Sequence, residues 1–476
     1  MSFIPLILLI VPLAASLFVL VCKENRIRHI LTFFSAVHLL LVLSGAYYRN
    51  GVITIGSIQL GFDIYDPAYY VLGITSLLFF FITLYLRSWI PADEECARIR
   101  KESPGMSNKM FSILMLLFLD TMTLTALSRD FGMLWVAVEA TTLASAPLIN
   151  FHKTKSSLEA MWKYLLLCSL GIGLALFGTM LLSASLAPNS SLSFGSIAVL
   201  KPVWFKAAFV FCFAGYGLKC GLAPFHSWLP DAHSEAPSPV SALLSGSLLN
   251  CALLGMWRMR DVAPEGSLQF CDNFFIFFGF VYLVVAAIFI IGQKDYKRML
   301  AYSSVEHMGL IALLIGFSAE GTALIHMTFH SLIKMMLFLA AGNILLCFGT
   351  RRISSVQGIF DFLPRTSKVW MAGMLLICGT PPSPLFFTEW ILISHAGIYL
   401  GGLILFLLFI IFCAMCNIVM KMCMSVPAEN TELIQLDAIA RKVNRVPAFI
   451  LYAILLGTLA VAAAVYLLAS ETITLF

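Results

Sequence analysis

The segment GYGLKCGLAPFHSWLPDAHSEAPSPVSALLSG, residues 215–246, is an apolar helix that is interrupted in its middle. It carries Lys219 shortly before the interruption at Gly221 and Pro224. A charged residue at membrane depth costs roughly 2.5 to 3.5 kcal/mol or more on insertion scales, so a lysine there indicates a functional site. Irregular backbone at that depth needs protein or water around it, because lipid cannot hydrogen-bond to the freed groups. The segment therefore predicts an ion or proton site at a broken transmembrane helix.

The composition predicts an integral membrane protein. Of 476 residues, 60% are hydrophobic and 12% are charged, and the mean hydropathy is +0.93. Soluble domains contain roughly 25% charged residues, so the composition excludes a water-soluble protein. The first apolar segment, residues 2–22, has no basic stretch before it. We expect it to be retained as a membrane span rather than cleaved as a signal peptide.

Apolar segments of sufficient length predict fourteen transmembrane helices in an all-α polytopic fold. The segments are residues 2–22, 30–47, 66–86, 110–127, 131–151, 158–185, 204–225, 239–257, 270–292, 299–317, 321–348, 369–395, 400–420 and 447–469. Residues 51–67 alternate apolar and polar side chains and predict an outer hairpin. The charged loop at residues 91–105 is interpreted as a solvated face, with a docking surface as the alternative. Residues 428–445 predict a short amphipathic segment at the cytoplasmic surface.

Lysine and arginine are distributed unequally between the two sides of the predicted membrane. The connections on one side carry 21 of them and those on the other side carry six. Because cytoplasmic loops are enriched in these residues, the richer side is predicted to be cytoplasmic and both termini to lie outside. We expect a multi-pass protein of the cytoplasmic (inner) membrane of a bacterium or archaeon. No basic block indicates a nucleic-acid partner.

Four stretches carry a resemblance to a known family. Besides the broken helix, they are LWVAVEATTLASAP (134–147), DYKRMLAYSSVEHMGL (295–310) and HMTFHSLIKMMLFLAAGN (326–343). The set resembles the antiporter-like proton-translocating membrane subunits of respiratory complex I, Mrp-type cation/proton antiporters and membrane-bound hydrogenases. The sequences EATTLASAP, AYSSVEHMG and SALLSG are most similar to the component F type of hydrogenase-4 and formate hydrogenlyase complexes.

The resemblance implies a single transmembrane domain with two inverted five-helix repeats. An N-terminal scaffold (1–105) would precede the first repeat (107–260) and the second (268–425), and a C-terminal helix (446–476) would follow. Helices seven and twelve would be the broken ones. The sequence itself contains both interruptions, since GTPPSP (379–384) divides the twelfth segment as Gly221 and Pro224 divide the seventh.

Glu139 and Lys219 form the predicted centre of the first repeat. The family places an essential glutamate on helix five, where Glu139 lies; the alternative is a protonated carboxyl that bonds a neighbouring helix. An isolated lysine in hydrocarbon would lose its proton, whereas one beside Glu139 would keep it. Lys219 would therefore change protonation when a neighbouring charge moves, a property that arginine lacks.

Other polar groups surround this centre in the sequence. Asp120 on helix four would be either a relay group or a neutral hydrogen-bonding group. Lys163 would either pair with Glu159, four residues earlier, or supply a second cation near the centre. His226 follows the break as a proton inlet. The residues after it, Asp231, His233 and Glu235, are interpreted as loop-capping and solvated.

The second repeat carries a stripe of titratable residues. His326, His330 and Lys334 are spaced by four and therefore share one face of helix eleven. Glu306 and His307 lie about two turns into helix ten, and the resemblance implies a charged residue on helix twelve, where Glu389 lies. Helix eight departs from the family, because complex I relatives have a histidine-containing stretch where this chain has Ser245, Gly246, Ser247 and Asn250. Water held by Ser247 and Asn250 would have to bridge that gap.

We expect the chain to translocate protons as one subunit of a redox-driven complex, with Glu139 setting the charge of Lys219 and Glu389 pairing with Lys334 or releasing the proton. The alternatives are a subunit of a multisubunit Na⁺/H⁺ antiporter and a structural membrane anchor. No catalytic centre or metal site is predicted in the chain; a NiFe centre and iron–sulfur clusters are expected in partner subunits, and Cys413 and Cys416 are interpreted as packing residues. The predicted proton-translocation residues are Glu139, Lys219, His326, His330, Lys334 and Glu389, with Asp120, Lys163, His226, Glu306 and His307 as auxiliary residues.

Overall fold

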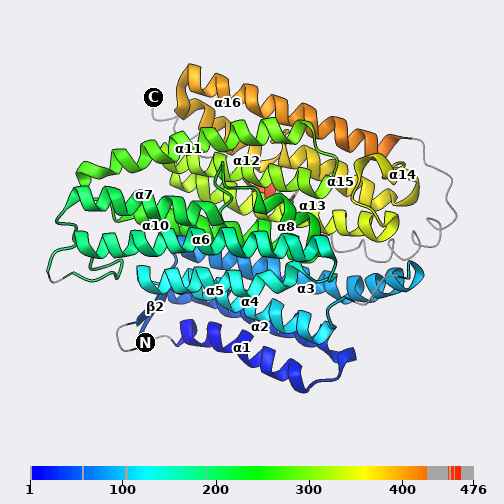
Figure 1. Cartoon of the computed structure of the whole chain (residues 1–476), viewed down its shortest axis with the longest axis horizontal. Coiled ribbons are helices and arrows are strands. Elements are labelled where there is room, and N and C mark those ends of the chain that lie inside the picture. Colours follow the sequence, from blue (N-terminus) through cyan, green and yellow to red (C-terminus); the bar gives the residue numbers. More distant parts are fainter. Residues whose placement is uncertain are drawn as a thin grey trace. The chain divides into compact units, whose positions relative to one another are not determined.

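The computed structural model describes residues 3–55, 58–101, 105–188 and 190–425, with short helical stretches at 449, 452–454 and 456–461 (Figure 1). The chain forms two compact units, Met1–Phe278 and Gly279–Phe476, which are described separately. Among the described residues, eleven helices are long and apolar enough to cross a membrane. The fold is an all-α polytopic membrane architecture, as the sequence predicts, whereas the count of fourteen helices and the inverted repeats stay predictions.

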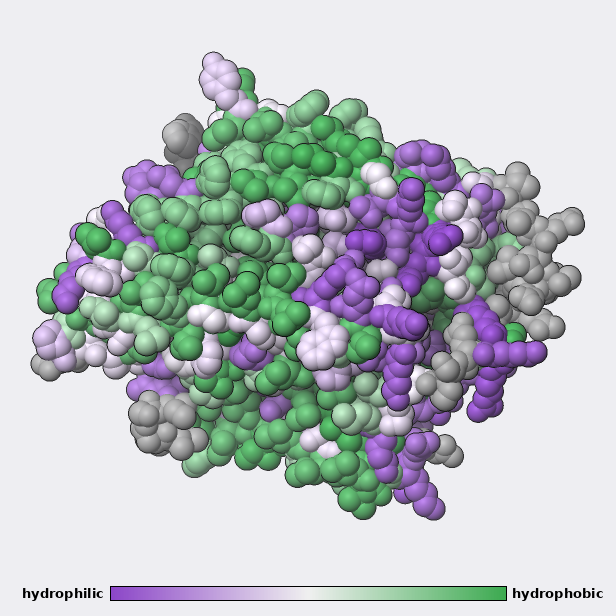
Figure 2. All heavy atoms as spheres, viewed as in Figure 1, coloured by the Kyte–Doolittle hydropathy of each residue, from purple (hydrophilic) through white to green (hydrophobic). Residues whose placement is uncertain are grey.

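Helices form nearly all of the first unit. Its elements are α1 (Ile4–Val21), α2 (Glu24–Tyr48), β1 (Asn50–Ile55), β2 (Ile58–Asp63), α3 (Pro67–Ile99), α4 (Asn108–Leu127), α5 (Phe131–Ile149), α6 (Lys155–Ser185), α7 (Pro202–Lys219), α8 (Trp228–Glu235), α9 (Ser238–Leu243), the π-helical turn η1 (Leu244–Leu248), α10 (Leu249–Asp261) and the first part of α11 (Glu265–Ile291). Helix α4 packs between α1 and α5, and α6 lies along α5, α7 and α8. Figure 2 shows hydrophobic side chains covering the lengths of α6 and α7, and hydrophilic ones gathered around α8. This distribution fits helices that present apolar surface to lipid.

The segment that follows α2 forms a two-stranded antiparallel hairpin, which confirms the hairpin predicted for residues 51–67. Asn50 pairs with Asp63, and the register continues to the turn. Behind the hairpin, the buried His38 of α2 connects three helices, because its two ring nitrogens lie 2.9 Å from the Ser76 hydroxyl of α3 and 3.1 Å from the Thr123 hydroxyl of α4. A buried histidine with both nitrogens hydrogen-bonded fixes the mutual position of these helices.

Helix α3 is longer than predicted, and this corrects the interpretation of residues 91–105 as a loop. The helix continues to Ile99, 13 residues beyond the predicted end at residue 86. In the extension, Trp89, Ala92 and Cys96 are buried. Their spacing of three and four places them on one helical face, so the extension packs against the protein while its charged residues stay at the surface.

Two other boundaries in the first unit differ from the sequence prediction. The seventh helix ends at Lys219 instead of residue 225, because the backbone breaks there and resumes as α8. The eighth, predicted as one segment over 239–257, is α9, η1 and α10 in succession. A π-helical turn inserts one residue into the helical repeat, which periodicity in the sequence does not reveal.

The second unit contains the rest of α11, α12 (Tyr296–Gly316), α13 (Glu320–Phe348), the 3-10 turn η2 (Ile353–Ser355), α14 (Ile359–Phe362), α15 (Pro364–Ile377) and α16 (Pro384–Met424). Helix α13 lies at its centre and packs against α12, α15 and α16. The predicted thirteenth helix continues the twelfth within α16, and the two are separated by a kink at Gly397. Cys413 is exposed and Cys416 is partly buried on the apolar helix α16, so the interpretation of the pair as small residues within the membrane core stays a prediction. The predicted segment 428–445 lies outside the described residues, as does most of the predicted helix 447–469.

Both units interrupt a helix with the same backbone arrangement, which confirms the two predicted breaks. Gly221 follows the end of α7 with φ 82°, and Gly379 follows the end of α15 with φ 61°. In each break the N–H of the residue after the glycine bonds the carbonyl five residues earlier, at 2.7 Å in the first and 3.0 Å in the second. These bonds form a Schellman motif, for which a left-handed glycine is the usual residue. A proline with a cis peptide bond, Pro224 or Pro382, stands three residues after each glycine.

Small residues bring α6 and α7 into close contact. A methyl group on Gly215 of α7 would lie 2.5 Å from the backbone of both Gly171 and Ala175 of α6. A methyl group on Gly178 of α6 would likewise lie 2.6 Å from the sulfur of Cys212 on α7. Helices that lack side chains at their crossing approach each other more closely, a common device in membranes. This contact sets the position of α7, and therefore of Lys219 at its end.

We expect Gly215→Ala to destabilise the protein by about 1 to 3 kcal/mol, the usual range for overpacking. The control is Gly173→Ala on α6, where an added methyl group meets nothing within 4 Å. Both variants gain the same helix propensity, so only the collision differs. Thermal unfolding of the purified protein in detergent measures the effect, and equal melting temperatures for the two variants would contradict the close packing.

Candidate functional site

Lys219 is the last residue of α7, and its side chain is fully buried against α5. Its Nζ donates hydrogen bonds to the Val138 carbonyl and to the Thr142 hydroxyl, the latter at 2.5 Å. Val138 and Thr142 lie four residues apart on α5, so both acceptors lie on one side of that helix. A buried ammonium requires such acceptors, because it has lost its hydration. The end of α7 is thus fixed to the middle of α5.

Glu139 reaches Lys219 through a hydroxyl rather than by direct contact. Its Oε2 accepts a hydrogen bond from Thr142 Oγ1 at 3.3 Å, and its Oε1 accepts one from Ser169 Oγ of α6 at 2.9 Å. Within the described ranges, Glu139 and Lys219 form no ion pair. The Thr142 hydroxyl therefore accepts from the lysine and donates to the carboxylate. The sequence predicts both charged residues but not the hydroxyl between them, although its position three residues after Glu139 was a signal.

The break after Lys219 is held by aromatic residues. Trp228, the first residue of α8, donates from Nε1 to the Leu218 carbonyl at 3.0 Å, which satisfies one of the free carbonyls at the end of α7. Its ring lies 5.0 Å from the ring of Tyr164 on α6. The Tyr164 hydroxyl in turn lies 2.7 Å from the Ser145 hydroxyl on α5. Helices α5, α6 and α8 thus support the segment that carries the lysine.

The auxiliary residues of the first unit lie around this centre. Lys163 forms ion pairs with Glu159 at 2.7 Å and with Asp231 of α8 at 3.1 Å, and 47% of its side chain is exposed. The ion pair with Glu159 is one of the two alternatives that the sequence left open for Lys163. His226 is buried within the break, and Asp120 is partly buried on α4. The side chain of His233 is fully buried in α8, so its interpretation as solvated is wrong.

The π-helical turn η1 coincides with the departure of helix eight from the family pattern. All five residues of Leu244–Leu248 are buried. The hydroxyl of Ser247 has no hydrogen-bond partner among the described residues, and Asn250 Nδ2 donates to the Gly246 carbonyl at 2.8 Å. A buried hydroxyl without a partner is the kind of group that an internal water satisfies. The buried side chains of Ser245, Ser247 and Asn250 are thus polar but non-titratable.

Two histidines in the second unit form a hydrogen-bonded chain across three helices. Thr388 Oγ1 of α16 lies 2.8 Å from His326 Nδ1 of α13, and His326 Nε2 lies 3.0 Å from His307 Nδ1 of α12. A neutral imidazole has one donor and one acceptor nitrogen. Thr388 Oγ1 also donates to the Leu385 carbonyl at 2.8 Å, so the observed arrangement donates from His307 through His326 to Thr388, and the opposite direction requires the Thr388 hydroxyl to turn away from that carbonyl. Changing between the arrangements moves protons along it.

His330 lies beside this chain, and its ring centroid is 5.0 Å from that of His307. Both of its ring nitrogens lack hydrogen-bond partners in the part of the chain that the structure describes. Lys334, one turn further along α13, donates from Nζ to the Leu300 carbonyl of α12 at 2.7 Å. The three residues that the sequence predicts to share a face of helix eleven, His326, His330 and Lys334, thus all lie buried on α13 and contact residues of α12.

Glu389 and Glu306 are two acids of the second unit that are buried. Lys334 interacts electrostatically with Glu306. It forms no ion pair with Glu389 among the described residues, so the structure does not show the pairing expected from the sequence. The carboxylate of Glu389 lies instead against the backbone of Gly379 in the second break, where a methyl group would come within 2.1 Å of it.

No group of three or more histidine, cysteine, aspartate or glutamate side chains within the described residues could hold a metal ion. The arrangement in each unit is instead a buried lysine held by α5 or α12, with a buried or partly buried acid nearby. Such groups can bind and release protons without a cofactor.

Comparison with known proteins identifies the family. The family model for the transmembrane part of NADH:quinone oxidoreductase and Mrp antiporters matches residues 128–416. The chain belongs to this family. The "Hydrogenase-4 component F homolog" of Methylacidiphilum infernorum is 34% identical over 68% of this chain and 70% of that protein. "Hydrogenase-4 component B" of Escherichia coli is 28% identical, and the match spans 61% of this chain but only 45% of that protein.

Solved structures agree with the fold of this antiporter-like family. The Mrp complex from Dietzia sp. contains a chain that matches with a TM-score of 0.79 over 97% of this chain and 96% of that chain, at 18% identity. At this identity the match shows the fold alone. The predicted resemblance to antiporter-like subunits is confirmed, and the family match covers all six predicted proton-translocation residues.

Thr142→Val should separate the lysine from the acid, because valine keeps the shape of threonine but loses the hydroxyl. We expect proton uptake by everted membrane vesicles to fall by about tenfold, the size of one hydrogen bond to a charged group. Thr142→Ser keeps a hydroxyl and is the matched control. Equal initial rates for the valine and serine variants would show that the hydroxyl has no part in the coupling.

Gly379→Ala should displace the carboxylate of Glu389 and reduce the same vesicle activity. The control is Gly397→Ala, which also replaces a glycine at positive φ in the second unit but meets nothing within 4 Å. Gly397 has φ 72° and ψ 178°, a conformation essentially confined to glycine, so its substitution carries backbone strain of its own, and a larger loss of activity in Gly379→Ala reports the displaced acid. A loss of activity that is the same in both variants would argue against a role for Glu389.

Proposed function

We propose that this chain is a proton-translocating membrane subunit of a redox-driven multisubunit complex of the hydrogenase-4 or formate hydrogenlyase type. The main support is the arrangement at the first break, where a fully buried lysine at a helix end meets a carboxylate through one hydroxyl. Family membership and the hydrogenase-4 component F homolog as a relative point in the same direction. The relatives and solved structures that this chain matches are components of larger membrane assemblies.

The proposed mechanism depends on charge balance at Lys219. With Glu139 ionised nearby, the ammonium is electrostatically compensated and the lysine keeps its proton. When Glu139 is neutralised or withdraws, the same ammonium becomes an uncompensated charge in apolar surroundings and gives up its proton. A conformational change in a neighbouring subunit that alters Glu139 would thereby drive proton release from Lys219.

In the second unit, the chain of Thr388, His326 and His307 performs the transfer step. When a proton enters at one end of this chain, a different proton leaves at the opposite end. The imidazoles must then turn or exchange protons before the next cycle. Lys334 and Glu306 would store the charge beside this chain, and Glu389 would exchange the proton with water at the second break. His330 would receive protons through internal water, since its ring nitrogens lack partners within the described ranges.

Redox chemistry belongs to partner subunits in this proposal. A NiFe centre and iron–sulfur clusters would lie in a peripheral arm that binds other membrane subunits. The complex would occupy the cytoplasmic membrane of a bacterium or archaeon, with both termini of this chain outside, as the lysine and arginine distribution indicates.

Two other functions have specific support. The family description includes Mrp antiporters, so a Na⁺/H⁺ antiporter subunit would use the same charged residues without a redox partner. A structural anchor that conducts no protons is favoured by the non-titratable residues of η1. The three functions differ in their partners and in the effect of losing Lys219.

Purification of the tagged chain from gently solubilised native membranes tests the assignment of the complex. We expect nickel, iron and iron–sulfur subunits to co-migrate with it, as identified by metal analysis and mass spectrometry. The co-migration of small hydrophobic subunits without redox metals would instead favour the antiporter.

Lys219→Met and Lys219→Arg should both abolish proton uptake by vesicles, because methionine carries no proton and arginine does not release one. The arginine variant keeps the positive charge and should assemble better, since an uncompensated buried partner costs roughly 3 to 5 kcal/mol. Lys206→Met, on the same helix, is the control. Normal proton transport by an assembled Lys219→Met complex would favour the structural anchor as the function of this chain.

A further inference from the structure

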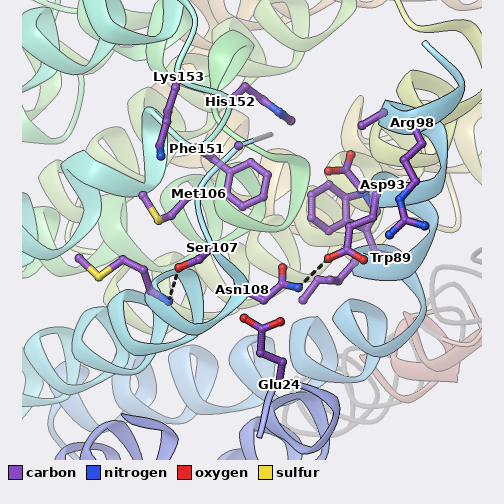
Figure 3. A pocket seen from close by; sticks show the side chains of 15 residues that line it. Glu24, Trp89, Asp93, Arg98, Met106, Ser107, Asn108, Phe151, His152 and Lys153 are labelled. Carbon is purple, nitrogen blue, oxygen red and sulfur yellow. Dashed lines mark hydrogen bonds between the residues drawn. The ribbon is translucent and has the colours of Figure 1, made fainter. Parts of the chain in front are cut away.

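One cleft of the first unit lies apart from Lys219 and Glu139, neither of which lines it. Figure 3 shows its lining, and its volume is about 770 Å³, within the usual range for sites that bind small molecules. It opens where the unpredicted extension of α3 passes over the residues before α4 and after α5. The lining residues are Glu24, Trp89, Ile90, Asp93, Glu94, Ala97, Arg98, Gly105, Met106, Ser107, Asn108, Met110, Phe151, His152 and Lys153.

We expect the cleft to lie at the level of lipid headgroups. Its walls come from the ends of four membrane spans, namely the start of α2 at Glu24, the far end of α3, the start of α4 at Asn108 and the residues that follow α5. Spans that begin or end together mark one face of the bilayer. Loops rich in lysine and arginine adjoin these ends, so this face is the one predicted to be cytoplasmic.

Charges of both signs face this space. Lys153 and Glu24 lie on opposite sides of the opening in Figure 3, and Arg98 extends from the end of α3. These three side chains are exposed and have no ion-pair partner among the described residues. Glu94, by contrast, accepts a hydrogen bond from Asn108 Nδ2 at 2.7 Å. The cleft therefore offers cations for an anionic group and a carboxylate for a cationic group in the same molecule.

An apolar wall lies beside these charges. Trp89 and Phe151 are buried with ring centroids 6.2 Å apart, and Met106 and Met110 line the same space. Tryptophan is enriched at the boundary between headgroups and acyl chains. A ligand with a zwitterionic head and an apolar body would contact both the charges and this wall.

We propose that the cleft binds a phospholipid whose headgroup carries a primary amine, with its phosphate on Lys153 or Arg98, which lie on opposite sides of the cleft in Figure 3, and its ammonium on Glu24. Basic pockets between spans at the cytoplasmic side commonly bind anionic lipids. Here the acidic wall disfavours a purely anionic headgroup, and a primary ammonium donates hydrogen bonds to a carboxylate that a quaternary choline cannot donate. The site lies outside the proposed transport residues and does not depend on the proposed function.

Native mass spectrometry of the purified chain, after exchange into mixed vesicles of phosphatidylethanolamine, phosphatidylcholine and phosphatidylglycerol at equal amounts, tests this site. We expect retention of phosphatidylethanolamine over both other lipids. Glu24→Gln should lower its preference over phosphatidylglycerol roughly fivefold, the size of one exposed ion pair. Arg98→Met with Lys153→Met should reduce the retention of all three lipids.

The controls are Glu95→Gln and Lys155→Met, two exposed residues next to the cleft that do not line it. They should leave lipid retention unchanged, and size-exclusion elution should show that every variant is folded. Equal retention of the three lipids by the unsubstituted protein would overturn the proposal. Equal effects of lining and control substitutions would do the same. A co-purifying polypeptide that is lost with Arg98→Met and Lys153→Met would assign the cleft to a protein partner instead.

Discussion

The attachment of the Lys219 ammonium to α5 is the constraint on which the first unit depends. A buried ammonium must find acceptors, and the Val138 carbonyl and Thr142 hydroxyl supply them. For the lysine to reach them, α7 must end at that residue and pack closely on α6, which the small residues at their crossing permit. The break, the helix contact and the site are therefore one arrangement, in which a carboxylate is coupled to the lysine through a single hydroxyl.

The second unit also combines a broken helix, a buried lysine and a carboxylate, but in a different order along the chain. Its break has the same Schellman motif, but the charged residue of that helix, Glu389, stands after the break instead of before it. Its lysine lies on the unbroken helix α13 and bonds a carbonyl of α12. Two histidines that bond each other then connect α12, α13 and α16, whereas in the described part of the first unit His38 connects three helices through hydroxyl groups alone. The first unit is thus suited to a change of charge state, and the second to passing protons along a chain.

The edge of the first unit adds a feature that is separate from these centres. The extension of α3 continues beyond the predicted membrane span, and its buried face closes one side of a cleft that contains both acids and bases. Because this cleft is formed by the ends of four spans, an occupant would influence how those spans are held together. Charged residues at a membrane face can therefore serve the assembly of the protein without taking part in transport.

The sequence by itself determined the class of the protein, the two helix breaks and the identity of the charged residues, because apolar runs, prolines and rare buried charges are local signals. It did not determine how these residues meet. The bond between Lys219 and Thr142 joins helices that are distant in sequence. The contact between His307 and His326 and the place of Glu389 beside Gly379 join successive helices, and they too depend on how those helices pack. The length of α3 and the π-helical turn also depend on packing, since buried positions on a charged segment and one inserted residue leave no clear periodicity. Only the tertiary structure decided these features, because each is a contact between surfaces and not a property of one segment.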